Sequence, residues 1–223
     1  MSVLILAAHS DDESIGMGGT IAKHTIKGDI VYGKYFTDGI GSRSSLKDED
    51  KIKREKASKK AAEIIGLKWL ESSNFPDNSM DSVPLLEIIK EIEKIKSFVK
   101  PKLIYTHSPS DLNIDHKIIA QATLTAFRPK SNEIYEEIRF FEVPSATDYG
   151  HISVTNTFKP NLYINIKDTW DKKYKALKEY ELEMNDFPNS RSLKGIEYLA
   201  RYRGSQVGLE YAEAFEVIRK IQR

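Results

Sequence analysis

The sequence predicts an α/β fold in which helices cover a mostly parallel β-sheet. Short apolar runs rich in β-branched and aromatic residues alternate with longer stretches of helical period, which is the pattern of βαβ units. The chain has 223 residues, of which 40% are hydrophobic and 30% are charged, enough for one substantial core. No internal repeat or low-complexity linker interrupts it, so residues 1–223 are expected to form a single domain.

The first half of the chain contains the clearest alternation. Expected strands lie at 2–8, 29–37, 68–72 and 102–107, and helical patterns lie at about 14–27, 48–65 and 84–99. The last of these is the most regular, because apolar side chains from Leu85 to Val99 form one stripe between Pro84 and Pro101. This half therefore indicates successive βαβ units.

The second half continues the pattern less regularly. A helix is expected from Ile114 to Phe127, where Arg128-Pro129 ends it. Two further strands are expected at 137–143 and 161–166. From about Asp168 the chain has an amphipathic helical pattern, and a further helical segment is expected from Ser192 onward.

Composition argues against several classes of function. The 34 Lys and Arg side chains nearly balance the 33 Asp and Glu, so with a formal net charge of +1 no nucleic acid partner is expected. The chain has no Cys, so any metal must be bound by His, Asp or Glu. No signal peptide and no integral membrane segment is recognisable, which predicts a soluble cytoplasmic protein. A homo-oligomer is compatible with the amphipathic C-terminal segments.

Acidic and histidine side chains gather after two of the expected strands. They are His9, Asp11, Asp12 and Glu13 after the first strand, and His107, Asp111, Asp115 and His116 after the fourth. Neighbouring carboxylates repel each other unless a cation or a proton relieves them. In open α/β sheets, ligands bind at the carboxyl ends of the strands. The two clusters together therefore indicate a cation site at that edge of the sheet.

His9, Asp12 and His116 fit a metal site with two imidazole nitrogens and one carboxylate. This ligand set suits Zn²⁺ and leaves a fourth position for water, although Fe²⁺, Mn²⁺ and Co²⁺ are also compatible with it. Asp11 is then left as a carboxylate beside the water, where it can act as a general base.

Simpler structural explanations exist for several of these residues. His107, Asp111 and Asp115, taken one at a time, are typical of hydrogen-bonded structural residues or helix N-caps. The segment "GMGG", residues 16–19, lacks the G-x-G-x-x-G spacing and follows acids that repel phosphate. Its glycines are therefore expected to allow close packing of a helix against the sheet.

The motifs allow a further comparison. "AAHSDDE" and "NIDHK" resemble the signatures A-H-P-D-D-E and H-P-D-H of the PIG-L/LmbE-like family of zinc-dependent N-acetylglucosamine deacetylases. "FTDG", "KREKASKKAAEIIG", "FPDN" and "RYRGSQVGLEYAEAFEV" also look like family segments and occur in the family's order. The resemblance implies a Rossmann-like three-layer sandwich and hydrolysis of the N-acetyl group of an N-acetylglucosamine-type sugar or glycoconjugate. It also implies that His9, Asp12 and His116 bind zinc and that Asp11 is the base.

The second motif departs from the family at Asn113-Ile114, where the family has His-Pro. In the family this histidine lies near the reacting carbonyl, so the resemblance implies a catalytic position for Asn113. An amide donates a hydrogen bond but transfers no proton. His107 and Asp111 are the alternatives for the missing role. Ser10, where the family has Pro, is expected to affect loop rigidity more than chemistry.

Substrate recognition is the least defined part of the prediction. Sugar hydroxyl groups require polar and aromatic partners, and candidates in the loops and nearby helix are Asp38, Arg43, Arg54, Asp77 and Asp111. Arg54 lies in a Lys- and Glu-rich helix, for which a solvated face is an equally good explanation. Two other functions stay open: a deacylase of another N-acylated small molecule, and a catalytically weakened sugar-binding homologue.

Overall fold

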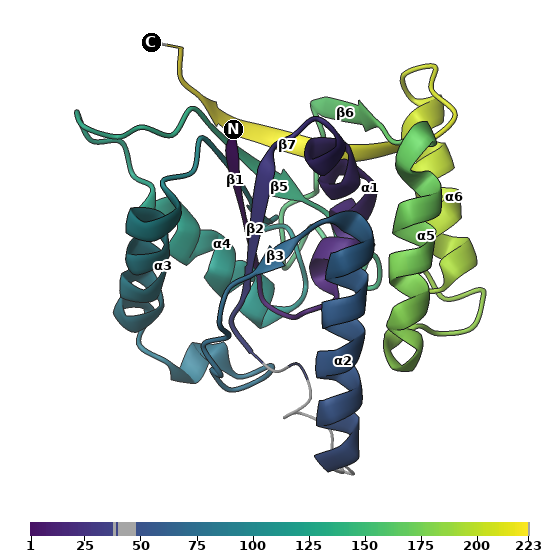
Figure 1. Cartoon of the computed structure of the whole chain (residues 1–223), viewed down its shortest axis with the longest axis horizontal. Coiled ribbons are helices and arrows are strands. Elements are labelled where there is room, and N and C mark those ends of the chain that lie inside the picture. Colours follow the sequence, from purple (N-terminus) through teal and green to yellow (C-terminus); the bar gives the residue numbers. More distant parts are fainter. Residues whose placement is uncertain (38, 40–47, 223) are drawn as a thin grey trace.

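A single sheet contains strands from both ends of the chain. The computed structural model describes residues 1–37, 39 and 48–222. They include a seven-stranded sheet in the order β3-β2-β1-β4-β5-β7-β6, with helices on both faces (Figure 1). The predicted α/β fold, a mostly parallel sheet between two layers of helices, is confirmed. Within the ranges that the structure describes, every helix is too short or too polar to cross a membrane.

Five neighbouring strands pair in parallel, and two antiparallel strands extend the sheet. The parallel strands are β1 (Ser2–Ala7), β2 (Ile30–Tyr35), β3 (Lys68–Trp69), β4 (Leu103–His107) and β5 (Glu137–Phe141). The antiparallel strands are β6 (Leu162–Asn165) and β7 (Ala212–Lys220), with β7 between β5 and β6. Strands β1 to β6 all lie within the ranges that the sequence predicted.

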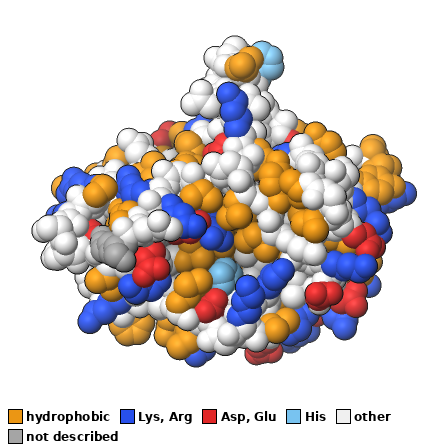
Figure 2. Space-filling model, turned by 90° about the horizontal axis from the view of Figure 1, so that it is seen from above, with side chains coloured by type: hydrophobic (Ala, Val, Ile, Leu, Met, Phe, Trp, Pro, Cys, Tyr) orange, Lys and Arg blue, Asp and Glu red, His pale blue; other side chains and the backbone are white. Residues whose placement is uncertain are grey.

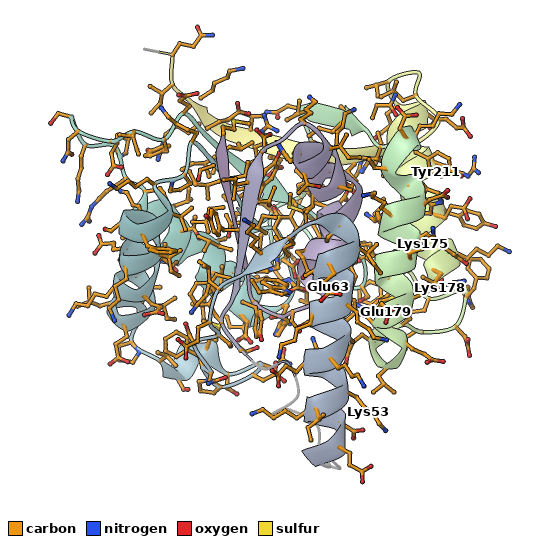
Figure 3. The ribbon with its side chains drawn as sticks, in the orientation of Figure 1. Lys53, Glu63, Lys175, Lys178, Glu179 and Tyr211 are labelled. Atoms are coloured by element: carbon orange, nitrogen blue, oxygen red, sulfur yellow. The ribbon has the colours of Figure 1, made fainter. Side chains whose placement is uncertain are left out.

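The helices form two layers (Figure 1). One face of the sheet is covered by α3 (Leu85–Val99) and α4 (Ile114–Ala126), and the other by α1 (Asp12–Ile26), α2 (Asp48–Ile65), α5 (Trp170–Glu179) and α6 (Leu193–Ser205). Short 3₁₀ helices lie at Met80–Ser82 (η1), Lys167–Thr169 (η2) and Glu181–Glu183 (η3). Figure 3 shows α2 and α5 side by side, and Lys60 Nζ lies 3.3 Å from Glu179 Oε2 across them.

Strand β1 lies at the centre of the sheet and is buried on both faces. Val3 and Ile5 belong to the core on the side of α1, α2 and α5, whereas Leu4 and Leu6 belong to the core under α3 and α4. All four side chains are fully buried. The first strand is therefore a continuous apolar run, because both of its faces meet a core.

Charged side chains of both signs cover the surface. On the face shown in Figure 2, Lys and Arg side chains are interspersed with Asp and Glu, as expected for a formal net charge of +1. This face therefore offers a polyanion no continuous basic surface.

The C-terminal segment differs from the prediction. The sequence predicted helix from Ser192 onward, but α6 ends at Ser205 and Ala212–Lys220 form strand β7. Alternating Ala and Glu at the start of this strand favour helix locally. Pairing with β5 on one side and β6 on the other overrides that preference. The helical prediction was wrong because both partners of β7 are distant in the sequence.

Helix α1 is broken at Met17, whose backbone angles are φ −148° and ψ 23°. Lys173 Nζ donates to the carbonyl oxygen of Ile15 at 2.8 Å, just before the break. After the break, the carboxylate of Glu213 accepts the two N–H groups of residues 19 and 20 at 3.0 and 2.7 Å. Lys173 and Glu213 are buried and pair with each other at 2.6 Å. One buried ion pair thus satisfies the backbone on both sides of the break.

The glycines around this break allow the helix to approach its neighbours closely. A Cβ atom on Gly16 would lie 2.6 Å from Cδ2 of Phe141, at the end of β5. A Cβ atom on Gly19 would lie 2.8 Å from Cβ of Ile166. Neither position accommodates a side chain, so the predicted role of the "GMGG" segment in close packing is confirmed.

Glu213→Gln is expected to destabilise the protein by about 3–5 kcal/mol, because it leaves the buried Lys173 ammonium without its counter-charge. Urea denaturation followed by circular dichroism measures the change. Glu210→Gln is the matched control, since Glu210 pairs with Lys167 at 2.7 Å on the exposed surface and its loss should leave the midpoint unchanged. Equal midpoints for the two variants would show that the buried pair does not stabilise the broken helix.

Candidate metal centre and active site

The two polar clusters meet at the carboxyl ends of β1 and β4. These strands pair in parallel, so the turns that follow them open at the same edge of the sheet. His9 lies in the turn after β1, Asp12 begins α1, and His116 lies in the first turn of α4. Their exposed fractions are 7%, 0% and 1%, so the three side chains meet in the interior.

His9, Asp12 and His116 present three donor atoms to one another. His9 Nδ1 lies 3.2 Å from Asp12 Oδ2 and 3.3 Å from His116 Nε2, and His116 Nε2 lies 3.3 Å from Asp12 Oδ2. Ligand atoms about 2.0–2.1 Å from a tetrahedral zinc ion lie roughly 3.3–3.4 Å apart. The second oxygen of Asp12 is buried without a hydrogen-bond partner among the described residues. The donor set and its spacing therefore fit a divalent cation.

The charges of this cluster are strongly coupled. Burial favours neutral Asp12, but His116, His9 and His107 together hold the pKa of its carboxyl well below the ordinary value. Burial likewise favours neutral His116, yet Asp12 and Asp111 raise its pKa to about 9. Asp12, Asp115 and Asp77 outweigh burial at His9 and raise its pKa well above the usual range. The buried carboxylates thus favour positive charge on the two histidines. A bound metal ion can provide that positive charge in place of protons.

Asp111 orients the His116 ring by contacting Nδ1, the nitrogen that faces away from the donor triad. Its Oδ2 lies 2.9 Å from His116 Nδ1 and accepts a hydrogen bond from Thr147 Oγ1 at 2.8 Å. Its Oδ1 accepts the backbone N–H of Asn113 at 2.9 Å. A carboxylate at Nδ1 fixes the imidazole tautomer and directs the lone pair of Nε2 toward the other donors. The sequence drew attention to Asp111 but carried no sign of Thr147, which lies on a loop.

Two further groups of donors overlap the first, namely His107 with Asp111 and His116, and His9 with Asp77 and Asp115. His9 Nε2 lies 3.2 Å from Asp77 Oδ1 and 3.3 Å from Asp115 Oδ2. Asp115 also accepts the backbone N–H groups of Asn78 and Met80, at 2.7 and 3.0 Å. Asp115 therefore fixes the "FPDN" loop, which leaves the first group as the best metal site.

His107 is enclosed between other side chains. It is fully buried, its ring stacks on that of His116 at 3.8 Å, and its Nε2 accepts the backbone N–H of Ala8 at 2.8 Å. Burial and the neighbouring His116 lower the pKa of His107 to about 4. A neutral, stacked imidazole in this position holds the turn after β1 against His116.

Asn113 is the N-cap of α4. Its Oδ1 accepts the backbone N–H groups of Asp115 and His116 at 2.8 and 3.4 Å. Its Nδ2 donates to Asn78 Oδ1 at 2.9 Å. Both ends of the amide are therefore engaged, one in holding the helix that carries His116 and the other in bridging to the "FPDN" loop.

Asp11 lies between two arginines and is 1% exposed. Arg54 Nη2 donates to its Oδ1 at 3.1 Å, and Arg191 Nη1 donates to its Oδ2 at 3.3 Å. Arg54 Nη1 in turn lies 2.5 Å from Glu183 Oε1. The two arginines thus hold the carboxylate in one orientation next to the donor triad. The sequence carries no local sign of Arg191, because its contact with Asp11 spans 180 residues.

Arg54 lies on the buried face of α2. The alternative explanation from the sequence, that Arg54 belongs to a solvent-exposed face of this helix, is therefore wrong. It is 6% exposed and shares its stripe with Ser58, Ala61, Ala62 and Ile65, all buried. Lys53 and Glu63, by contrast, lie on exposed positions of the same helix (Figure 3). The spacing of small and apolar residues was the available signal for the burial of Arg54. Asp38 and Arg43, also predicted to bind substrate, lie outside the described residues.

A cleft of ≈ 390 Å³ opens beside this site. Ser10, between His9 and Asp11, lines it together with Arg54, and Tyr35 and Trp69 provide aromatic walls. The two rings pack edge to face with centroids 5.0 Å apart. The cleft therefore combines hydrogen-bonding groups and aromatic surface next to Asp11.

Glu13, to which the sequence assigned no role, is fully buried and contacts the end of α5. Its Oε1 accepts hydrogen bonds from Ser14 Oγ at 2.7 Å and Tyr180 Oη at 3.1 Å. Burial raises the pKa of its carboxyl to about 8. Glu13 is therefore a neutral acid at neutral pH that ties α1 to the end of α5.

Comparison with known proteins identifies the family. Residues 4–127, which include the donor triad, match the PIG-L family, described as GlcNAc-PI de-N-acetylase. The chain belongs to this family. It is 26% identical to the diacetylchitobiose deacetylase of Thermococcus kodakarensis over 223 residues, which is 97% of this chain and 82% of the relative.

Solved structures share the fold. The N,N'-diacetylchitobiose deacetylase of Pyrococcus horikoshii superposes with a TM-score of 0.78 and 24% identity, over 97% of this chain and 83% of that one. GalB of Pseudomonas putida, a 4-carboxy-2-hydroxymuconate hydratase, superposes with a TM-score of 0.77 and 20% identity, over 100% and 98%. Because the fold also occurs in a hydratase, the reaction must be argued from the site.

Asn113→Ala is expected to cost about 1 kcal/mol of stability, because α4 loses its N-cap. Asn113→Ser is the matched control, since a serine hydroxyl caps the helix but does not reach Asn78. Thermal and urea unfolding of the two variants measure the difference. An alanine variant as stable as the serine variant would contradict the capping role.

Proposed function

We propose that this chain is a metal-dependent hydrolase that removes the N-acetyl group from an N-acetylglucosamine-type sugar or glycoconjugate. The observation that carries the proposal is the triad of His9, Asp12 and His116 donor atoms, 3.2–3.3 Å apart, with the Asp11 carboxylate beside it. Membership in the PIG-L family and the likeness to a diacetylchitobiose deacetylase support the choice of an acetylated amino sugar.

His9, Asp12 and His116 would hold the cation, and zinc is the metal that their donor set suits best. A bound divalent cation would polarise the acetamide carbonyl and acidify the attacking water. Asp111 keeps His116 in the tautomer that binds metal through Nε2. His107 packs behind His116 and keeps its ring in place.

Asp11 is the general base. It accepts a proton from the water that attacks the acetamide carbon, and it returns that proton to the nitrogen as the C–N bond breaks. The proton on nitrogen is essential because an amide anion is a very poor leaving group. Arg54 and Arg191 hold the carboxylate in one orientation, which keeps its proton-accepting oxygens in place.

The sugar is expected to contact Arg54 and Asp77, with Asp38 and Arg43 as further candidates. Ser10, Tyr35 and Trp69 of the adjacent cleft provide hydrogen-bonding and stacking surface that suits a sugar ring. Two alternatives keep the same site: a deacylase of another N-acylated small molecule, and a sugar-binding homologue with weakened catalysis. The cytoplasmic location stays a prediction.

Asp11→Asn is expected to retain the metal but to lose at least about 10²-fold in kcat, because the amide accepts no proton. His116→Ala is expected to lose the metal and with it all activity, and dialysis of the wild type against a chelator should have the same effect until Zn²⁺ is restored. Amine release from N-acetylglucosamine, diacetylchitobiose and N-formyl analogues measures activity, and atomic absorption measures metal.

Asp81→Asn is the control, since Asp81 is an exposed carboxylate outside the site. Full activity of Asp11→Asn would contradict the general-base role. A wild-type chain that binds zinc stoichiometrically but frees no amine from any of the acylated sugars would favour the sugar-binding alternative.

A further inference from the structure

Arg191 reaches the site from a segment far from the proposed metal ligands in the sequence. It lies between η3 and α6, and its side chain is 19% exposed. Its backbone is fixed on both sides: its N–H donates to Asn189 Oδ1 at 2.8 Å, and its carbonyl accepts the N–H of Asn185 at 3.2 Å. The next residue, Ser192, caps α6 through its hydroxyl. The guanidinium is therefore held at the site by a constrained turn.

The two arginines at Asp11 differ in their surroundings. Arg54 is neutralised twice, by Asp11 at 3.1 Å and by Glu183 at 2.5 Å. Arg191 pairs only with Asp11 among the residues that the structure describes, at 3.3 Å. Its Nε is buried and has no hydrogen-bond partner within the same ranges. Arg191 thus brings a cation that a single carboxylate neutralises into contact with Asp11.

The other groups that could support a developing negative charge are engaged elsewhere. The amide of Asn113 caps α4 through Oδ1 and donates to Asn78 through Nδ2. His107 accepts the N–H of Ala8 through Nε2 and is stacked on His116, and its side chain is fully buried, so a substrate does not reach its remaining donor at Nδ1. Arg54 and Arg191 each have an Nε without a hydrogen-bond partner among the described residues, but Arg54 is paired with two carboxylates and Arg191 with one. Arg191 is therefore the less neutralised of the two cations.

We propose that Arg191 binds the carbonyl oxygen of the substrate and stabilises the negative charge that this oxygen gains during hydrolysis. The inference rests on the proposed function. Water attacks the carbonyl carbon, a C–O bond forms, and the π electrons of the carbonyl move onto its oxygen while Asp11 takes the proton of water. Collapse restores the carbonyl, breaks the C–N bond, and moves that proton from Asp11 to nitrogen.

Arg191 keeps its own proton throughout, because a guanidinium does not titrate in proteins. Its contribution is electrostatic: a charge-assisted hydrogen bond in a buried site strengthens as the oxygen becomes negative. Arg191 is therefore a catalytic residue by this proposal, whereas Arg54, paired with two carboxylates, positions Asp11.

The test compares Arg191→Ala, Arg191→Lys and the wild type in the amine-release assay with diacetylchitobiose. Loss of one oxyanion donor should lower the kcat of Arg191→Ala by about 10²–10³-fold with a much smaller change in KM. Bound zinc per chain should equal that of the wild type. Arg191→Lys should recover part of the activity, because its ammonium supplies a cation.

Guanidinium chloride, added well below the concentration that unfolds the protein, should partly restore Arg191→Ala, whereas urea at the same concentration should not. Arg128→Ala is the matched control, since Arg128 is exposed and distant in sequence from the site. It should keep wild-type activity and show no response to guanidinium.

Three results would overturn the inference. Wild-type kcat in Arg191→Ala would show that the guanidinium is dispensable. A low kcat that neither lysine nor guanidinium restores, with a lowered melting temperature, would assign Arg191 a purely structural role. Absence of amine release from the zinc-loaded wild type would overturn the proposed function itself, and this inference with it.

Discussion

The contact among His9 Nδ1, Asp12 Oδ2 and His116 Nε2 is the feature on which the rest of the site depends. These atoms come from the ends of two adjacent parallel strands and lie 3.2–3.3 Å apart in the interior. A carboxylate buried in this way is stable only beside positive charge. Contacts from the surrounding structure hold the three donor atoms at this spacing. Asp11 lies beside them but is not one of the proposed metal ligands.

The contacts that hold the donor atoms come from segments far apart in the chain. Asp111 fixes His116 from the opposite side of its ring, and Asn113 caps the helix that carries it. The start of α1, which carries Asp12, is followed by a break that the buried pair of Lys173 and Glu213 satisfies. The C-terminal strand is thus tied to the site through α1. Catalytic geometry and stability are linked here, since the same helix serves both.

Strands and site residues that are marked by a local pattern or motif could be predicted from the sequence. Features that depend on contacts between residues distant in the sequence could not. Strands β1 to β6 were predicted because apolar runs between turns mark them, and His116 was matched to the first motif by its chemistry. Strand β7 was missed because its Ala- and Glu-rich start favours helix and its partners are remote. Arg54 was left undecided although its spacing on α2 marks a buried face, and no local pattern marks Arg191.

The central claim is that one divalent cation binds among the first group of donors and not in either overlapping group. Crystals grown with Zn²⁺ and measured at the zinc absorption edge test it directly. The account predicts one anomalous peak about 2.0–2.2 Å from His9 Nδ1, Asp12 Oδ2 and His116 Nε2. A peak that lies instead among His9 Nε2, Asp77 and Asp115, or among His107, Asp111 and His116, would contradict it.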